Sequence, residues 1–301
     1  MSVTVRVPAK VNVQLAVGAA RADGFHDLAN VFLAVGLYDE VTVTPAAGLR
    51  VTCEGPDARQ VPLDRTNLAA RAAIALAERY GRTPDVHLHI VKDIPVAGGM
   101  AGGSADGAGA LLACDALWGT GATRDELLEI CAELGSDVPF SLVGGAALGT
   151  GRGEKLTALE VGGTFPWVFA MAARGLSTPS VFREFDRLAQ GRDIPEPVAS
   201  RRLLDALAEG DPDALAATVS NDLQPAALSL FPELADTLAA GRAAGALAAL
   251  VSGSGPTTAF LARDTAAAER IAAALRTSGT CKSVRVAAGP APGATVVGPR
   301  P

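Results

Sequence analysis

The sequence contains little histidine, cysteine or aromatic residue, and it lacks an excess of basic charge. Among 301 residues there are three His and four Cys, and the cysteines stand far apart, which argues against a zinc site or a dithiol motif. Aromatic residues make up 4%, which disfavours a base-stacking platform. The 26 Lys and Arg against 32 Asp and Glu leave a charge of −6, whereas nucleic acids and anionic lipids attract basic surfaces. We therefore expect no nucleic-acid and no membrane partner, and nothing implies a protein partner.

Long apolar runs are absent as well. No stretch approaches the roughly 18 apolar residues of a membrane span, and residues 1–10 lack the apolar centre of a signal peptide. Hydrophobic residues nevertheless make up 49% of the chain, enough for a sizeable core. We expect a cytoplasmic protein with two domains, 1–160 and 161–301.

Hydrophobic patterning predicts an α+β fold. Alternation predicts strands over 3–7 and 11–17, with shorter strands at 41–44, 49–53 and 86–92. Helices are predicted from about 67 to 81, 104 to 118 and 123 to 135, the last with a Thr123–Glu126 capping box, and another is expected to start near 138. The second half predicts strands at 167–172, 257–262 and 283–287, a helix over 265–278 and an irregular tail from residue 289.

Glycine is abundant, with 33 residues, and its densest cluster lies between a predicted strand and a predicted helix at 95–105. Glycine lets the backbone approach closely, and a helix N-terminus favours anions, so such a loop suits phosphates. Gly98 and Gly103 have the spacing of a Walker A loop, but Ser104 replaces its lysine, and the Rossmann spacing does not fit either. The loop is therefore a third kind of phosphate loop or a flexible turn. Gly107 and Gly109 within the following helix indicate close packing or close ligand approach.

Three segments in order resemble the signature motifs of the GHMP kinases. They are PAKVN at 8–12, PVAGGMAGGSA at 95–105 and VSGSGP at 251–256. Within that family, RADGFH at 21–26 with LYDE at 37–40, and LGSDVPF at 134–140 with GTGRGE at 149–154, resemble the members that phosphorylate a cytidine-diphosphate sugar alcohol in isoprenoid synthesis. The resemblance implies a two-domain kinase fold with the active site in the cleft between the domains.

The resemblance implies that Lys10 and Asp137 are the catalytic residues. Asp137 would be the base, whereas from the sequence alone it also suits a helix N-cap. Lys10 stands alone in an apolar strand, where a charge is costly unless paired, and the resemblance makes it the partner of Asp137; a strand-edge lysine is the alternative.

The resemblance also implies ATP and Mg²⁺ as cofactors. Ser104 is the expected magnesium ligand. The expected ATP-binding residues are Pro95, Val96, Ala97, Gly98, Gly99, Met100, Ala101, Gly102, Gly103, Ser104 and Ala105, with Asn67 and Lys92 toward the adenosine. Asn67 also suits a helix cap, and Lys92 an exposed strand position.

For the acceptor, a small molecule carrying a cytidine diphosphate group, the implied binding residues are Asn12, Phe25, His26 and Phe182. Phe25 stands where the family usually has Tyr, so it keeps a ring for stacking and loses the hydroxyl. Ala101 and Ala105 replace Gly and Ser, and we expect Ala101 to resist a positive φ. The alternatives are another kinase of this family, acting on homoserine or mevalonate, or a non-catalytic nucleotide-binding protein on the same fold.

Overall fold

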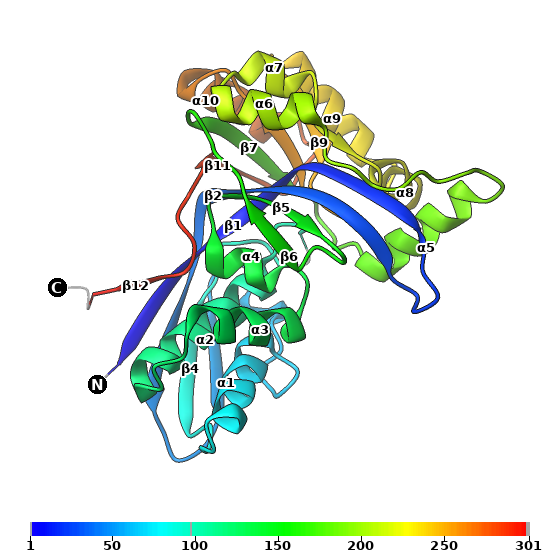
Figure 1. The fold of residues 1–301 in the computed structure, drawn as a ribbon. Coiled ribbons are helices and arrows are strands. Elements are labelled where there is room, and N and C mark those ends of the chain that lie inside the picture. Colours follow the sequence, from blue (N-terminus) through cyan, green and yellow to red (C-terminus); the bar gives the residue numbers. More distant parts are fainter. Residues whose placement is uncertain (1, 97, 299–301) are drawn as a thin grey trace.

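The computed structural model describes residues 2–96 and 98–298, and within them the backbone forms two sheets covered by helices (Figure 1). The first sheet runs in the order β12-β1-β2-β4-β3, with β5, β6 and β8 attached to it. Its strands are β1 (Val3–Ala20), β2 (His26–Pro45), β3 (Arg50–Glu54), β4 (Val86–Val91), β5 (Ala146–Thr150), β6 (Lys155–Ala158), β8 (Ser220–Asn221) and β12 (Thr295–Val297).

A long antiparallel hairpin of β1 and β2 forms the centre of the molecule. Its register runs from Val3 opposite Val43 to Ala20 opposite His26, and it shifts after Pro8. The two strands predicted over 3–7 and 11–17 are therefore one strand with an irregularity at Pro8, which has no N–H to donate. The strand predicted at 41–44 is only the end of β2, because the buried apolar run before it carries no clear alternation.

Helices α2 (Gly102–Trp118) and α4 (Val138–Val143) pack on the first sheet. Helices α1 (Leu68–Arg79) and α3 (Arg124–Leu134) pack against these helices, and the short helix η1 (Ala58–Gln60) contacts β3. The capping box of Thr123 and Glu126 is present at the start of α3. A Cβ on Gly109 would lie 2.8 Å from Val7 Cγ2, so α2 lies against the sheet too closely for a side chain there. Of the two explanations for this glycine, close packing is confirmed.

The second sheet runs in the order β11-β7-β10-β9. Its strands are β7 (Phe165–Met171), β9 (Ala248–Val251), β10 (Thr258–Leu261) and β11 (Ser283–Gly289). Helices α5 (Thr178–Ala189), α6 (Arg201–Glu209), α7 (Pro212–Ala216), α8 (Gln224–Leu230), α9 (Leu234–Ala243) and α10 (Thr265–Thr277) accompany it. Large side chains such as Trp167, Phe169 and Phe260 are buried on this sheet.

Two short strands from the second half of the chain join the first sheet. β8 pairs parallel with Gln14 and Leu15 of β1, and β12 pairs antiparallel with Thr4–Arg6. The prediction of an irregular tail from residue 289 was therefore wrong in part, because β12 forms on the free edge of β1, a pairing partner that lies almost 300 residues earlier. The division at residue 160 stays a prediction, and the main hydrophobic core contains residues from both sides of it, including Val5 and Trp167.

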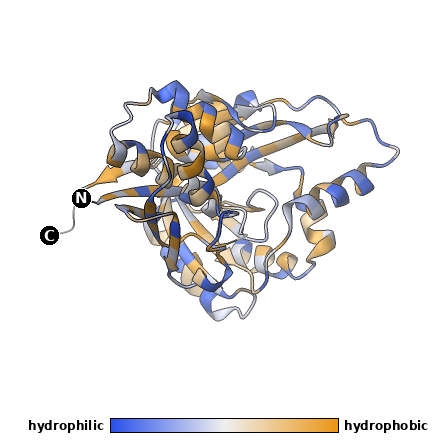
Figure 2. Cartoon of the chain, turned by 90° about the horizontal axis from the view of Figure 1, so that it is seen from below, coloured by the Kyte–Doolittle hydropathy of each residue, from blue (hydrophilic) through white to orange (hydrophobic). Residues whose placement is uncertain are grey.

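Hydrophobic segments gather where the helices meet the sheets, and hydrophilic segments lie along the outer helices and loops (Figure 2). Among the described residues, no helix is both long and apolar enough to cross a membrane.

Candidate active site

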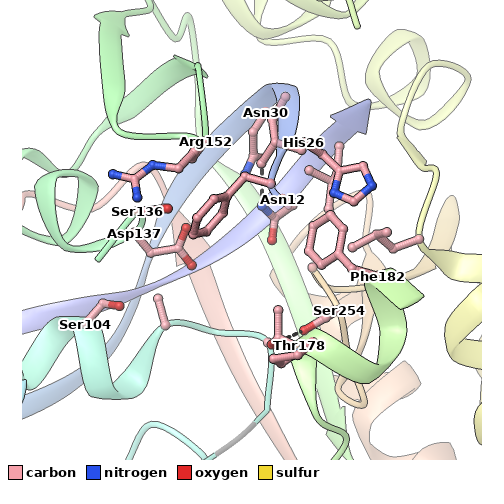
Figure 3. Close-up of a pocket in the computed structure, with 18 of the residues that line it drawn as sticks. Asn12, His26, Asn30, Ser104, Ser136, Asp137, Arg152, Thr178, Phe182 and Ser254 are labelled. Carbon is pink, nitrogen blue, oxygen red and sulfur yellow. Dashed lines mark hydrogen bonds between the residues drawn. The ribbon is translucent and has the colours of Figure 1, made fainter. Parts of the chain in front are cut away.

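A cavity of about 630 Å³ lies between the loops of the first sheet and helix α5 (Figure 3). Its walls come from the β1–β2 hairpin, the glycine loop before α2, the start of α4, the β5–β6 turn, α5 and the turn after β9. The lining residues are Lys10, Asn12, Leu15, Gly24, Phe25, His26, Leu28, Asn30, Leu68, Gly98, Gly99, Ala101, Gly102, Gly103, Ser104, Ser136, Asp137, Arg152, Thr178, Pro179, Phe182, Arg183, Asp186, Leu223, Gly253 and Ser254.

Lys10 and Asp137 meet in this cavity. Lys10 Nζ lies 3.4 Å from Asp137 Oδ2, and it donates a 2.6 Å hydrogen bond to Asn12 Oδ1 on the same face of β1. Asn12 Nδ2 in turn donates to Asn30 Oδ1 on β2 at 2.6 Å. The lysine side chain is 5% exposed and that of Asp137 is 32% exposed, so a buried cation holds a carboxylate that faces the cavity.

Asp137 occupies the N-cap position of α4, yet within the part of the chain that the structure describes its side chain accepts no capping hydrogen bond. The Asp137 carboxylate therefore does not cap the helix, and the alternative interpretation of this residue was wrong. Its backbone carbonyl accepts from Ser141 N, so the main chain starts the helix while the carboxylate faces Lys10.

The glycine loop reaches the cavity through Gly98, Gly99, Ala101, Gly102, Gly103 and Ser104. Gly99 has φ +72°, and a Cβ there would lie 2.1 Å from Ser252 O, so only glycine fits. Ala101 has φ +62° at the N-cap of α2, which corrects the expectation that it would avoid a positive φ; the tight entry into the helix imposes this conformation.

The other predicted members of the loop lie elsewhere. Met100 and Ala105 are fully buried in the core, where their side chains cannot contact a ligand in the cavity. Pro95 and Val96 line a second, smaller cavity of about 200 Å³, and Ala97 lies outside the described residues. Gly98 borders both cavities, so the loop separates them.

Asn67 and Lys92 do not line the main cavity. Asn67 Oδ1 accepts from Ala69 N at 2.8 Å, so it caps α1, as its alternative interpretation held. Lys92 is neither the expected adenosine contact nor an exposed strand residue. Its side chain is 1% exposed, because it turns under α2 and binds Asp39 Oδ2 at 2.5 Å and Asp106 Oδ2 at 2.9 Å.

The pair of carboxylates around Lys92 is strongly perturbed. Burial raises the pKa of Asp106 to about 8 against the opposing charge of Lys92, and burial raises the pKa of Asp39 as well. Asp39 Oδ1 also accepts from the backbone N–H groups of Asp93 and Ile94, whereas Asp106 Oδ1 has no hydrogen-bond partner among the described residues. These three residues join β2, the segment after β4 and α2, and a Cβ on Gly102 at the start of α2 would lie 2.9 Å from Lys92 Nζ.

Aromatic residues collect at the other end of the cavity. The ring of His26 lies 5.0 Å from that of Phe182, tilted by 32°, and its Nε2 lies 2.9 Å from Asp186 Oδ1. Phe25, at the tip of the β1–β2 hairpin, is 49% exposed. The guanidinium of Arg152 stands over the Phe25 ring at 5.1 Å. The structure thus brings Phe25, His26 and Phe182 to one cavity.

Sequence reasoning missed several polar residues of the cavity as individual contacts. They are Asn30, Ser136, Arg152, Thr178, Arg183 and Asp186. Ser136 and Arg152 belong to the motifs at 134–140 and 149–154, but no role was predicted for either residue. Asn30 lies in the part of β2 that was not predicted, and its pairing with Asn12 depends on the hairpin register.

Ser104 reaches the cavity at the start of α2, the position expected of a magnesium ligand. Within residues 2–96 and 98–298, no group of three or more His, Cys, Asp or Glu side chains could hold a metal by itself. Mg²⁺ is usually bound by one or two protein oxygens together with substrate phosphates, and Ser104 and Asp137 are oxygen donors that line this cavity. The residues therefore fit a magnesium ion that arrives with a nucleotide.

A cleft with a lysine–carboxylate pair, a glycine loop and a separate aromatic end defines a small-molecule phosphotransferase site. The chain matches the GHMP kinases N terminal domain over residues 67–145 and the GHMP kinases C terminal domain over 203–281. The protein belongs to the GHMP kinase family.

Relatives that match over the full length of the chain carry the name of one particular kinase of this family. The chain is 83% identical to 4-diphosphocytidyl-2-C-methyl-D-erythritol kinase of Streptomyces coelicolor over 99% of this chain and the whole of that one, and 61% identical to the kinase of the same name from Thermobifida fusca over 98% of each. A crystal structure of 4-(cytidine 5'-diphospho)-2C-methyl-D-erythritol kinase superposes with a TM-score of 0.75 at 35% identity, covering 94% of this chain and 98% of that one. Homoserine kinase from Cytophaga hutchinsonii, 20% identical with a TM-score of 0.75 over 98% and 97% of the chains, shares the fold.

Proposed function

We propose that the protein is an ATP-dependent kinase that phosphorylates the 2-hydroxyl of 4-diphosphocytidyl-2-C-methyl-D-erythritol in the non-mevalonate isoprenoid precursor pathway. The observation that carries the proposal is the Lys10–Asp137 pair, 3.4 Å apart, in a single cavity that has the glycine loop at one end and Phe25, His26 and Phe182 at the other. Full-length relatives that carry this kinase name at 55–83% identity support the choice of acceptor.

Asp137 is the residue that receives the proton of the acceptor hydroxyl. Its carboxylate is free of capping bonds and faces the cavity, while Lys10 lies beside it and is oriented by Asn12. The lysine charge lies 3.4 Å from the carboxylate, at the cavity surface, where it can attract the reacting oxygen. Because an aspartate is a weak base for an alcohol, most of the rate enhancement comes from positioning and charge stabilisation.

The glycine loop and the first turn of α2 bind the phosphates of ATP. Gly98, Gly99 and Gly102 let the loop pack closely on the protein behind it, since a Cβ at these positions would lie 2.9 Å from Thr257 Oγ1, 2.1 Å from Ser252 O and 2.9 Å from Lys92 Nζ. The 17-residue helix α2 directs its N-terminal N–H groups at the loop, which suits an anion. Ser104 would hold Mg²⁺ together with the phosphates, and when bound the ion neutralises charge on the transferred group.

Phe25, His26 and Phe182 bind the cytidine end of the acceptor. The exposed Phe25 ring offers a stacking face, and His26 is held by Asp186 so that its ring is oriented toward the cavity end. This aromatic end is what distinguishes the proposed acceptor from homoserine and mevalonate, which have no base to stack.

The test is ADP release with ATP and Mg²⁺ against a panel of acceptors. We expect turnover only with 4-diphosphocytidyl-2-C-methyl-D-erythritol, and none with homoserine or mevalonate. Asp137→Asn should lower kcat by about 10²–10⁴ while leaving ATP binding unchanged. Asp193→Asn, which changes an exposed carboxylate in the loop after α5, is the matched control and should behave as wild type. Near-normal turnover by Asp137→Asn would contradict the assignment of the base, and turnover on another acceptor would contradict that of the substrate.

A further inference from the structure

The cavity contains an arginine that the reaction described above leaves without a role. Arg152 lies in the turn of residues 151–154 between β5 and β6, and Figure 3 shows it on the same side of the cavity as Ser136 and Asp137, with His26 and Phe182 on the opposite side. Its guanidinium also stands over the Phe25 ring at 5.1 Å. Arg152 therefore lies on the Asp137 side of the cavity and reaches Phe25, one of the residues for the nucleoside.

The backbone of this turn is held firmly. Gly151 and Gly153 have φ of +69° and +109°, conformations that other residues rarely adopt. Gly151 O accepts from Leu28 N at 2.8 Å, which ties the turn to β2 two residues after His26. Arg152 N donates to Glu154 Oε2 at 2.7 Å. The base of the arginine is thus fixed while its long side chain extends over the cavity.

The guanidinium itself is only loosely engaged. Over the part of the chain that the structure describes, its N–H groups have no hydrogen bond, and its nearest carboxylate oxygen, Glu154 Oε2, lies 3.9 Å from Nε. The other cavity cations are engaged: Lys10 by Asn12 and Asp137, and Arg183 by Ser180 Oγ at 2.9 Å. A planar guanidinium with open donors in a cavity for an anionic substrate is suited to phosphate oxygens, which it binds bidentately.

We propose that Arg152 is a specificity-determining residue that binds the diphosphate of the acceptor, an inference that rests on the function proposed above. In the structure the guanidinium stands over the Phe25 ring, 5.1 Å from its centroid. When the base stacks on that ring, the guanidinium turns to the diphosphate, which connects the nucleoside to the sugar alcohol beside Asp137.

The test compares binding of two probes, CDP and cytidine, by calorimetry at low salt, together with steady-state kinetics. Arg152→Met keeps an apolar stem over Phe25 and removes the charge. We expect the Kd of CDP to rise about tenfold or more, as the loss of a charged hydrogen bond predicts, and that of cytidine to change less than about twofold. KM for the acceptor should rise in parallel, with kcat and KM for ATP near wild type, and Arg152→Lys should restore part of the loss. Arg201→Met, at an exposed position of α6, is the matched control.

Each outcome decides one point. If Arg152→Met raises the Kd of CDP and the Kd of cytidine by the same factor, the arginine only supports Phe25 and the proposal is wrong. The proposal is also wrong if Arg152→Met changes the Kd of neither probe, or if Arg183→Met rather than Arg152→Met removes the preference for CDP over cytidine. A wild-type protein that binds ADP but neither cytidine nor CDP would overturn the acceptor assignment itself, together with this inference.

Discussion

Replacing Lys92 with methionine should destabilise the protein by about 3–5 kcal/mol, the cost of removing one partner from a buried charge cluster. The structure supports that range. Lys92 makes two hydrogen bonds to carboxylates, at 2.5 Å to Asp39 and 2.9 Å to Asp106, and charged hydrogen bonds contribute about 1.5–3 kcal/mol each. Methionine has a similar volume, so the change measures lost charge rather than a new cavity.

The assay is urea unfolding followed by circular dichroism, with thermal unfolding beside it. For 301 residues, 3–5 kcal/mol corresponds to a fall in Tm of roughly 5–8 °C. Lys155→Met, on the exposed side of β6, is the matched control and should stay within about 0.5 kcal/mol of wild type. At pH 9, where the Asp106 carboxyl with its pKa of about 8 is ionised in the wild type, the Lys92 substitution should cost at least about 1 kcal/mol less in an Asp106→Asn background, because one of its charged partners is then neutral.

The same variant also tests whether Lys92 contacts the nucleotide. A Cβ on Gly102 would lie 2.9 Å from Lys92 Nζ, so the lysine packs directly against the first residue of α2. We therefore expect a modest rise in KM for ATP caused by a looser loop. A stability change below about 1 kcal/mol combined with a large loss of ADP affinity would refute the reasoning and return Lys92 to the adenosine site.

Two further predictions concern α2. Because burial raises the pKa of Asp106 from 3.8 to about 8, the folded protein retains a proton there that the unfolded chain has released, so the free energy of unfolding should fall as pH rises from about 4 to 8, by at most ~1.4 kcal/mol per pH unit. Asp106→Asn should flatten that dependence in urea titrations at several pH values, and an unchanged slope would contradict it. Ala101→Gly should stabilise the protein by about 0.5–1 kcal/mol, because φ +62° costs alanine about 1–2 kcal/mol and part of this gain is lost to the freer unfolded glycine. Destabilisation by the glycine would show that the conformation is not strained.

Local features were predictable from the sequence because neighbouring residues determine them. The capping box of Thr123 and Glu126, the glycine loop before α2, and the helix that starts beside Asp137 each depend on contacts within a few residues. The alternation of β4, with His87 and His89 on its more exposed face, is likewise a property of adjacent positions. The motif order was specific enough to identify the family, and the family matches confirmed it.

Tertiary structure decided whatever depends on which distant segments meet. Lys92 has the sequence context of an exposed strand lysine, and only the packing of β2 and α2 around it makes it a buried ion-pair centre. Asn30 reaches Asn12 because the register of a hairpin that spans residues 3–45 places them together, and β12 forms because β1 leaves an edge for it. Arg152 lies over Phe25 because Gly151 is tied to β2. These contacts join residues up to almost 300 positions apart, a separation over which local patterning carries no information.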